Sequence, residues 1–126
     1  MMERILIEET DKEILEVLKI ALEEDGFIIL GTLGFDPGFM KMIDDFRPHV
    51  IILDYRLDDT ESARVCQEIK NKYPYLPVLA LSCNSNIHLA YDLHGFDDYI
   101  RKPFDLHILY KILRKHIAVS VQHIGG

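Results

Sequence analysis

Four short runs of the sequence are apolar on both faces, and this feature limits the fold more than any other. Such runs are typical of strands that helices cover on both sides, as in a parallel sheet. Between the runs, apolar residues recur every three to four positions, which is the period of an amphipathic helix. The alternation predicts an α/β protein. Strands are expected at residues 5–7, 27–32, 50–53, 78–81 and 99–100.

A helix is expected after each of these strands. Proline, glycine and capping residues suggest where three of them begin or end: Pro37 near the start of the second, Gly95 after the fourth (86–94), and Asp105 as the N-cap of the fifth. The third is expected over 61–73, ahead of a proline. Five βα units with right-handed crossovers have few arrangements, and order 2-1-3-4-5 is a common one.

We therefore expect one doubly wound (βα)5 domain over residues 1–118, with a five-stranded parallel sheet of order 2-1-3-4-5 and helices on both faces. Helical periodicity fades after residue 118, and the chain closes with Gly125 and Gly126. Residues 119–126 are expected to form a C-terminal tail or a truncated linker.

Composition excludes several classes of function. The formal charge of −7, without a run of Lys or Arg, argues against a direct nucleic-acid partner or an anionic membrane surface. The apolar runs are too short to span a bilayer and no signal peptide is present, so a cytoplasmic location is expected. Cys66 and Cys83 lack zinc-site spacing and are expected to be free thiols.

Polar residues follow several of the expected strands. In a parallel sheet these strand ends meet at one edge, where ligands bind next to the reversal of strand order. Carboxylates ligate Mg²⁺, whereas a lysine and a hydroxyl neutralise phosphate oxygens. The edge is thus predicted to bind a divalent cation and a phosphoryl group, with Asp54 as the nucleophile. Its expected members are Glu8, Glu9, Thr10 and Asp11 after the first strand, together with Asp54, Ser82 and Lys102.

Four stretches from about residue 4 to residue 116 stand at matching places in the βα order: RILIEETDKEILEVLKIALEEDGF, PHVIILDYRL, PVLALS and GFDDYIRKPFD. In these stretches the sequence resembles the receiver domain of bacterial response regulators, a module of two-component signalling with a flavodoxin-like fold. The segments ILDYRL and DDYIRKPF are highly specific together.

This resemblance implies a role for each matching residue. Asp54 is similar to the aspartate that accepts a phosphoryl group from a histidine kinase or a small-molecule donor, with Mg²⁺ as cofactor. Ser82 matches the hydroxyl that turns toward the phosphoryl group, and Lys102 matches the lysine that pairs with it. Tyr99 matches the switch aromatic, and Pro103 is expected to follow Lys102 through a cis peptide bond.

One position departs from the family pattern. The expected pair of acids after the first strand falls on Glu9 and Thr10, so Mg²⁺ is expected to bind weakly or through water, with Glu9 and Asp54 as ligands. A register shifted by one residue would instead place Glu8 and Glu9 in the acid pair. It would also turn every side chain of the strand to the opposite face of the sheet. Thr10 is also expected to cap the first helix, with Glu13 completing a capping box.

Three acidic residues, Asp58, Asp59 and Glu61, lie close after Asp54. They either assist a metal or are solvated on the loop, and the second interpretation is favoured.

The sequence leaves two functions in view. The first is a phosphoacceptor receiver, whose expected partner is a histidine kinase or phosphotransfer protein. Such a receiver is not expected to be an enzyme, apart from self-catalysed phosphoryl transfer and dephosphorylation. The second is an atypical receiver that binds proteins without phosphorylation. A flavodoxin-like enzyme or carrier is disfavoured, because no cofactor loop is found. By resemblance, a homodimer would use the fourth helix, fifth strand and fifth helix, with the charges Asp97, Arg101, Arg114 and Lys115.

Overall fold

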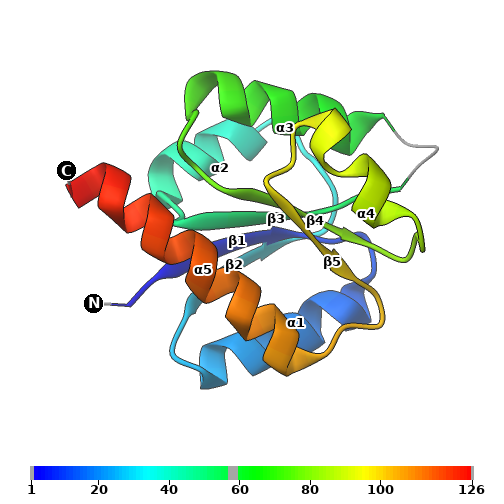
Figure 1. Cartoon of the computed structure of the whole chain (residues 1–126). Coiled ribbons are helices and arrows are strands. Elements are labelled where there is room, and N and C mark those ends of the chain that lie inside the picture. The colour runs from blue at the N-terminus through cyan, green and yellow to red at the C-terminus, as the bar shows by residue number, and fades with distance from the viewer. Residues whose placement is uncertain (1, 57–59, 126) are drawn as a thin grey trace.

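Strands form where the sequence has its apolar runs. The computed structural model describes residues 2–56 and 60–125, with side chains up to residue 118. Its single sheet is parallel throughout and has the order β2-β1-β3-β4-β5, which confirms the predicted fold class (Figure 1). The strands are β1 (Arg4–Glu8), β2 (Ile28–Thr32), β3 (Val50–Asp54), β4 (Val78–Ser82) and β5 (Asp98–Arg101).

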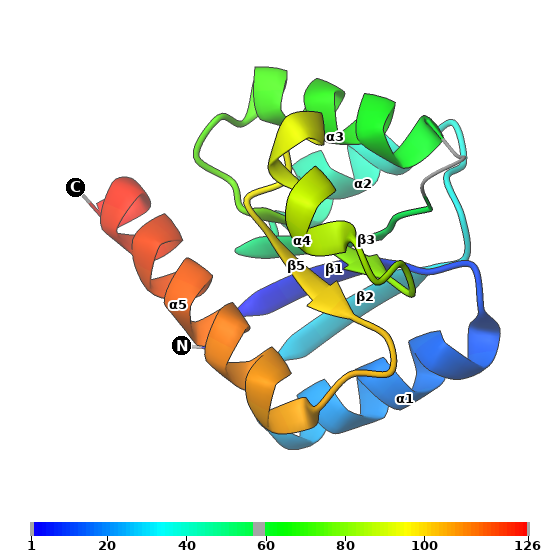
Figure 2. The same ribbon diagram turned by 45° about the vertical axis from the view of Figure 1, so that its right-hand side comes forward.

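Helices cover both faces of this sheet, as Figure 2 shows from a second direction. Two of them, α1 and α5, lie on one face, and the others lie on the opposite face. The sheet therefore separates two apolar cores. The helices are α1 (Lys12–Glu24), α2 (Phe39–Phe46), α3 (Glu61–Lys72), α4 (Ile87–Ala90) and α5 (Leu106–Gly125), with a single 3₁₀ turn, η1 (Asp92–His94), after α4.

Alternation along each strand divides its side chains between the two cores. In β1, Ile5 and Ile7 pack with α1 and α5, whereas Leu6 packs with the layer of α2 and α3. All residues of β3 and β4 are buried, as expected for strands covered on both sides. This burial fixes the register and so holds the polar residues at the strand ends in place.

Two helices differ from expectation. The segment expected as one helix over 86–94 is divided between α4 and η1, and only Ile87 of these two elements is buried. The fifth helix does not end near residue 118 but continues through residues 119–125, where a tail was expected. The Asp105 carboxylate accepts hydrogen bonds from the backbone of His107 and Ile108, which confirms it as the N-cap.

Candidate functional site

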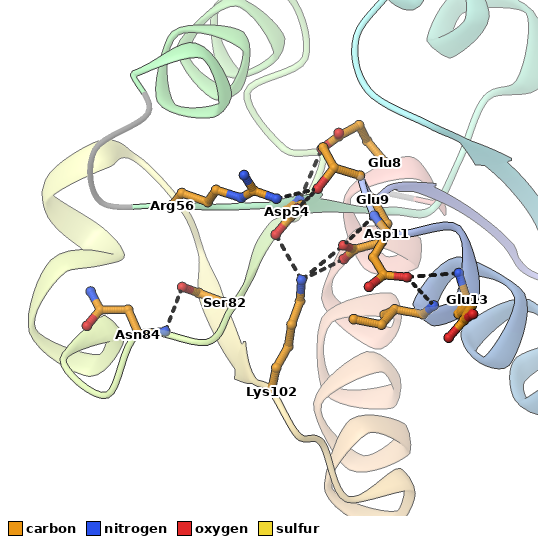
Figure 3. A network of polar contacts seen from close by, with 11 residues as sticks. Glu8, Glu9, Asp11, Glu13, Asp54, Arg56, Ser82, Asn84 and Lys102 are labelled. Atoms are coloured by element: carbon orange, nitrogen blue, oxygen red, sulfur yellow. Dashed lines mark hydrogen bonds and ion pairs between the residues drawn. The ribbon is translucent and has the colours of Figure 1, made fainter.

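A crevice opens at the carboxyl ends of β1, β3, β4 and β5 (Figure 3). It is lined by Glu9, Asp11, Asp54, Ser82 and Lys102, all of which the sequence placed at this edge. Both Cys66, which is buried, and Cys83, which is exposed at the crevice, are free thiols as expected.

Lys102 pairs with the carboxylates of both Glu9 and Asp54. Its Nζ lies 3.0 Å from Asp54 Oδ1, 3.0 Å from Glu9 Oε1 and 2.9 Å from Glu9 Oε2. The side chains of Glu9, Asp54 and Lys102 are only 0%, 4% and 10% exposed, so water screens these ion pairs weakly. The β5 strand delivers Lys102 to this place, and its backbone N–H donates to the Ser82 carbonyl, 2.9 Å away.

Burial and hydrogen-bond partners shift the pKa values of these groups in opposite directions. Burial alone would raise the pKa of Asp54, but hydrogen bonds from Thr10 and Lys102 lower it below its ordinary value. Burial opposes the charge of Lys102, yet its bonds to Glu9 and Asp54 raise its pKa. Burial raises the pKa of Glu9 against the hydrogen bond from Lys102. Of Glu9 and Asp54, Asp54 is therefore the carboxylate more strongly held in its charged form.

Thr10 contacts Asp54 directly instead of capping α1. Its hydroxyl donates to Asp54 Oδ2, 2.6 Å away, and accepts a hydrogen bond from Arg56 Nη2 at 2.9 Å. The N-cap of α1 is Asp11, whose carboxylate accepts from the backbone N–H groups of Glu13 and Ile14. The predicted capping box is thus wrong, because the neighbouring aspartate provides the cap and frees the threonine hydroxyl for the crevice.

Glu8 lies under the crevice and contacts the backbone of the phosphoacceptor candidate. Its side chain is buried, and Oε1 accepts a hydrogen bond from the Asp54 N–H, 3.1 Å away. Burial, together with the nearby charges of Asp54, Glu9 and Glu61, raises the pKa of Glu8 to about 8. The sequence placed Glu8 at this edge and, in the shifted register, in the acid pair. The structure instead brings Glu9 to Lys102 and Thr10 to Asp54.

The structure places Ser82 in the crevice and Tyr99 outside it. The buried Ser82 hydroxyl accepts a hydrogen bond from the Asn84 N–H at 3.1 Å. Tyr99 lies outside the crevice and packs against Tyr91, with 5.0 Å between the ring centroids. The Lys102–Pro103 peptide bond is cis, as the resemblance implies.

The donor set is compatible with Mg²⁺. Mg²⁺ is often bound through one or two carboxylates with water in its remaining positions, and Glu9 and Asp54 supply two. Thr10 offers a neutral oxygen where a third acid was expected. Within residues 2–56 and 60–125, no group of three or more acidic, histidine or cysteine side chains is arranged to hold a metal. Asp58 and Asp59, two of the three loop acids considered, lie outside the described residues.

The sheet is parallel, and a charged crevice lies beyond the carboxyl ends of its strands. This arrangement defines a doubly wound α/β protein, a class in which ligands bind where the strand order reverses. The family model described as "Response regulator receiver domain" matches residues 5–114. The chain therefore belongs to the response regulator receiver domains of two-component systems, which are signalling proteins and not classical enzymes.

Three known proteins illustrate the similarity. Transcriptional regulatory protein CseB of Streptomyces coelicolor is 31% identical over 127 residues, which cover 97% of this chain and 52% of CseB. DNA-binding transcriptional regulator NtrC of Proteus hauseri is 27% identical over 104 residues, or 81% of this chain and 22% of NtrC. The BeF3-activated DrrB receiver domain has a TM-score of 0.76 at 28% identity, with 94% of this chain and 99% of that chain covered.

The chain spans about half the length of CseB and less of NtrC. NtrC is described as DNA-binding, so the expected lack of a nucleic-acid partner does not match that relative taken as a whole. The prediction is therefore restricted to the receiver domain alone. None of the helices described is both long and apolar enough to cross a membrane.

Proposed function

We propose that this chain accepts a phosphoryl group on Asp54 and in response changes a protein-binding surface. The observation that carries the proposal is the Asp54 carboxylate, which lies in a crevice open to a donor and is held charged by Lys102 and Thr10. An ionised carboxylate is the form that can attack phosphorus.

The transfer step is a displacement at phosphorus. An oxygen of Asp54 forms a bond to phosphorus while the bond from phosphorus to the leaving group breaks, and the leaving group takes that electron pair. The leaving group is the imidazole nitrogen of a histidine kinase or phosphotransfer protein, or the carboxylate of a small acyl phosphate. Asp54 then carries an acyl phosphate. We place this exchange in the cytoplasm, as expected from the sequence.

Each crevice residue has a proposed part in this step. Mg²⁺ bound through Glu9 and Asp54 would supply charge that neutralises the phosphoryl oxygens. Lys102 keeps its ammonium beside Asp54 and binds a phosphoryl oxygen. The Ser82 hydroxyl, now bonded to the Asn84 N–H, rotates to donate to another oxygen.

The output surface is proposed to be the face formed by α4, β5 and α5. Tyr99 of β5 contacts Tyr91 next to α4, so rotation of the Tyr99 ring would alter the packing of α4. The face also exposes Leu89, Leu93 and Ile108, which suit an apolar partner surface.

A homodimer through the same face is also proposed, but three of the four charges considered for it have partners within the chain. Asp97 pairs with Lys70, and Arg114 pairs with Asp25. Arg101 contacts His88 and the Ser85 carbonyl. A dimer would therefore rest on the apolar residues of the face more than on new ion pairs.

A second candidate function is supported by Thr10. Replacing an acid by a neutral hydroxyl weakens metal binding, and Lys102 already pairs with both remaining carboxylates. A receiver with such a site would bind its protein partners through the same face without phosphorylation.

A titration with Mg²⁺ and beryllofluoride, a phosphoryl analogue, tests between the two functions. Amide NMR shifts around Asp54, Ser82, Tyr99 and Lys102 would be followed in the wild type and in Asp54→Asn. Saturable shifts in the wild type that vanish in Asp54→Asn are expected for a phosphoacceptor. Asp45→Asn, which changes an exposed carboxylate on α2, is the matched control and should respond like the wild type. Silence in every variant, with the protein folded, would favour the phosphorylation-independent function.

A further inference from the structure

Arg56 is a charged residue of the crevice that the proposed function does not use. It stands two residues beyond Asp54 and lines the crevice. Its Nη2 donates to the Thr10 hydroxyl at 2.9 Å, and that hydroxyl donates to Asp54 Oδ2 at 2.6 Å. The guanidinium is therefore separated from the Asp54 carboxylate by a single hydroxyl group.

Each carboxylate oxygen of Asp54 is thus oriented toward a different cation. Oδ1 accepts from Lys102, which directly follows β5 (Figure 3). Oδ2 accepts from the Thr10 hydroxyl, to which Arg56 donates. A phosphoryl group attached to either oxygen would lie within the crevice that both cations line.

Acids and bases nearly balance in the described crevice without a divalent ion. Its lining includes the acids Glu9, Asp11 and Asp54 and the bases Lys102 and Arg56. An acid at position 10 would add a further negative charge and pair with Arg56. With Thr10 there instead, the guanidinium is bonded to a neutral group, and its charge remains available to an incoming anion.

A guanidinium suits a phosphoryl group for geometric reasons. It is planar, remains charged, and presents five N–H donors in a fork that matches two oxygens of a phosphoryl group at once. Arg56 is exposed at the crevice, so its side chain can reorient from Thr10 toward such a group without breaking core packing.

We propose that Arg56 is a second cationic ligand of the phosphoryl group on Asp54, and that its charge makes binding of that group less dependent on a divalent cation. The inference rests on the proposed function, since it requires a phosphoryl group at Asp54. In this inference, Arg56 supplies part of the positive charge that the metal ion would otherwise supply to the phosphoryl group.

Arg56→Gln tests the proposal, because glutamine keeps a polar side chain with N–H donors but carries no charge. The probe is beryllofluoride, titrated in Mg²⁺-free buffer and at saturating Mg²⁺ and followed by amide NMR. In Mg²⁺-free buffer, the wild type is expected to bind the probe about tenfold or more tightly than Arg56→Gln, as for loss of one charge-assisted hydrogen bond. The difference should shrink at saturating Mg²⁺.

A second measurement separates a ligand from a residue that only positions Thr10. Without beryllofluoride, Arg56→Gln should bind Mg²⁺ more tightly than the wild type, because a positive charge has left the crevice. A purely structural role would weaken both kinds of binding together. Arg56→Lys should retain most of the Mg²⁺-free binding, and Arg64→Gln, which changes an exposed arginine of α3 outside the crevice, should match the wild type.

The outcomes distinguish this inference from the proposed function. If the wild type binds beryllofluoride only with Mg²⁺, or if Arg56→Gln binds as tightly as the wild type without Mg²⁺, the role of Arg56 is refuted while the phosphoacceptor function stands. If the wild type binds the probe under neither condition, both are refuted.

Discussion

Glu8 carries a carboxyl group that is almost completely buried next to the backbone of Asp54. Its pKa is raised from an ordinary 4.5 to about 8, because burial penalises its charged form and three neighbouring carboxylates repel it. In the folded protein at neutral pH it is therefore a neutral acid, although the sequence alone counts it as a charge.

This shift predicts how stability depends on pH. In the window between the two pKa values the unfolded chain has lost the Glu8 proton while the folded protein keeps it, so stability falls as pH rises, by up to about 1.4 kcal/mol per pH unit. The contribution of Glu8 is complete below about pH 4.5 and is lost as pH rises through about 8. Glu8→Gln removes the titration and should be the more stable protein at neutral pH.

Urea unfolding of both proteins at several values between about pH 5 and pH 8, without metal, measures this effect. The difference between their free energies of unfolding should grow with pH. A difference that stays constant across the window would show that Glu8 does not titrate as described.

Residues at the carboxyl ends of strands could be predicted from the sequence, because parallel strands bring those ends together whatever the loops do. Asp54 and Lys102 belong to this group. The partner of Thr10 could not be predicted, because Thr10 and Asp11 are both good N-caps and only the three-dimensional position of Asp54 decides between them. Arg56 lies where no periodicity indicates the direction of its side chain.

The α5 helix begins where the sequence predicted it. The Asp105 carboxylate accepts from the His107 N–H at 2.8 Å and the Ile108 N–H at 3.3 Å. These bonds satisfy amide groups that have no partner within the helix.

Asp105→Ala should therefore lower the free energy of unfolding by about 1 kcal/mol. Asp105→Asn retains a capping oxygen and should cost much less. Urea unfolding measures both, and the dependence of free energy on urea concentration should be unchanged. Equal losses in the two variants would mean that charge, and not the cap, accounts for the effect.

The helix between β4 and β5 could not be predicted in its full extent. Its length was inferred from the position of Gly95, but Leu89 and Leu93 are 65% and 79% exposed. With so little apolar burial, tertiary packing does not hold a continuous helix over this segment, and α4 ends at Ala90. The longer helices bury continuous stripes, and their positions follow from the sequence.

Two apolar cores lie on either side of the sheet, and the crevice opens at the carboxyl ends of its strands. The face of α4, β5 and α5 contains β5, the strand that ends directly before Lys102. A change at the crevice can therefore reach this face through a single strand.

We predict that beryllofluoride with Mg²⁺ favours dimers through this face. Sedimentation velocity of the wild type should show a larger species with the analogue, and Ile108→Glu should suppress it by placing a charge on an exposed apolar residue of α5. Ile20→Glu changes a similarly exposed isoleucine on α1 and should leave dimerisation unchanged. Only monomers in the wild type, with and without the analogue, would refute the dimer.

The tilted contact between Tyr91 and Tyr99 has a spectroscopic consequence. The chain contains six tyrosines and no tryptophan, so its aromatic circular dichroism arises from tyrosine and phenylalanine alone. Two tyrosine rings with centroids 5.0 Å apart and planes at 46° are close enough for their transitions to couple. Any rotation of the Tyr99 ring would change that coupling, so the unlabelled protein contains its own optical reporter of the proposed switch.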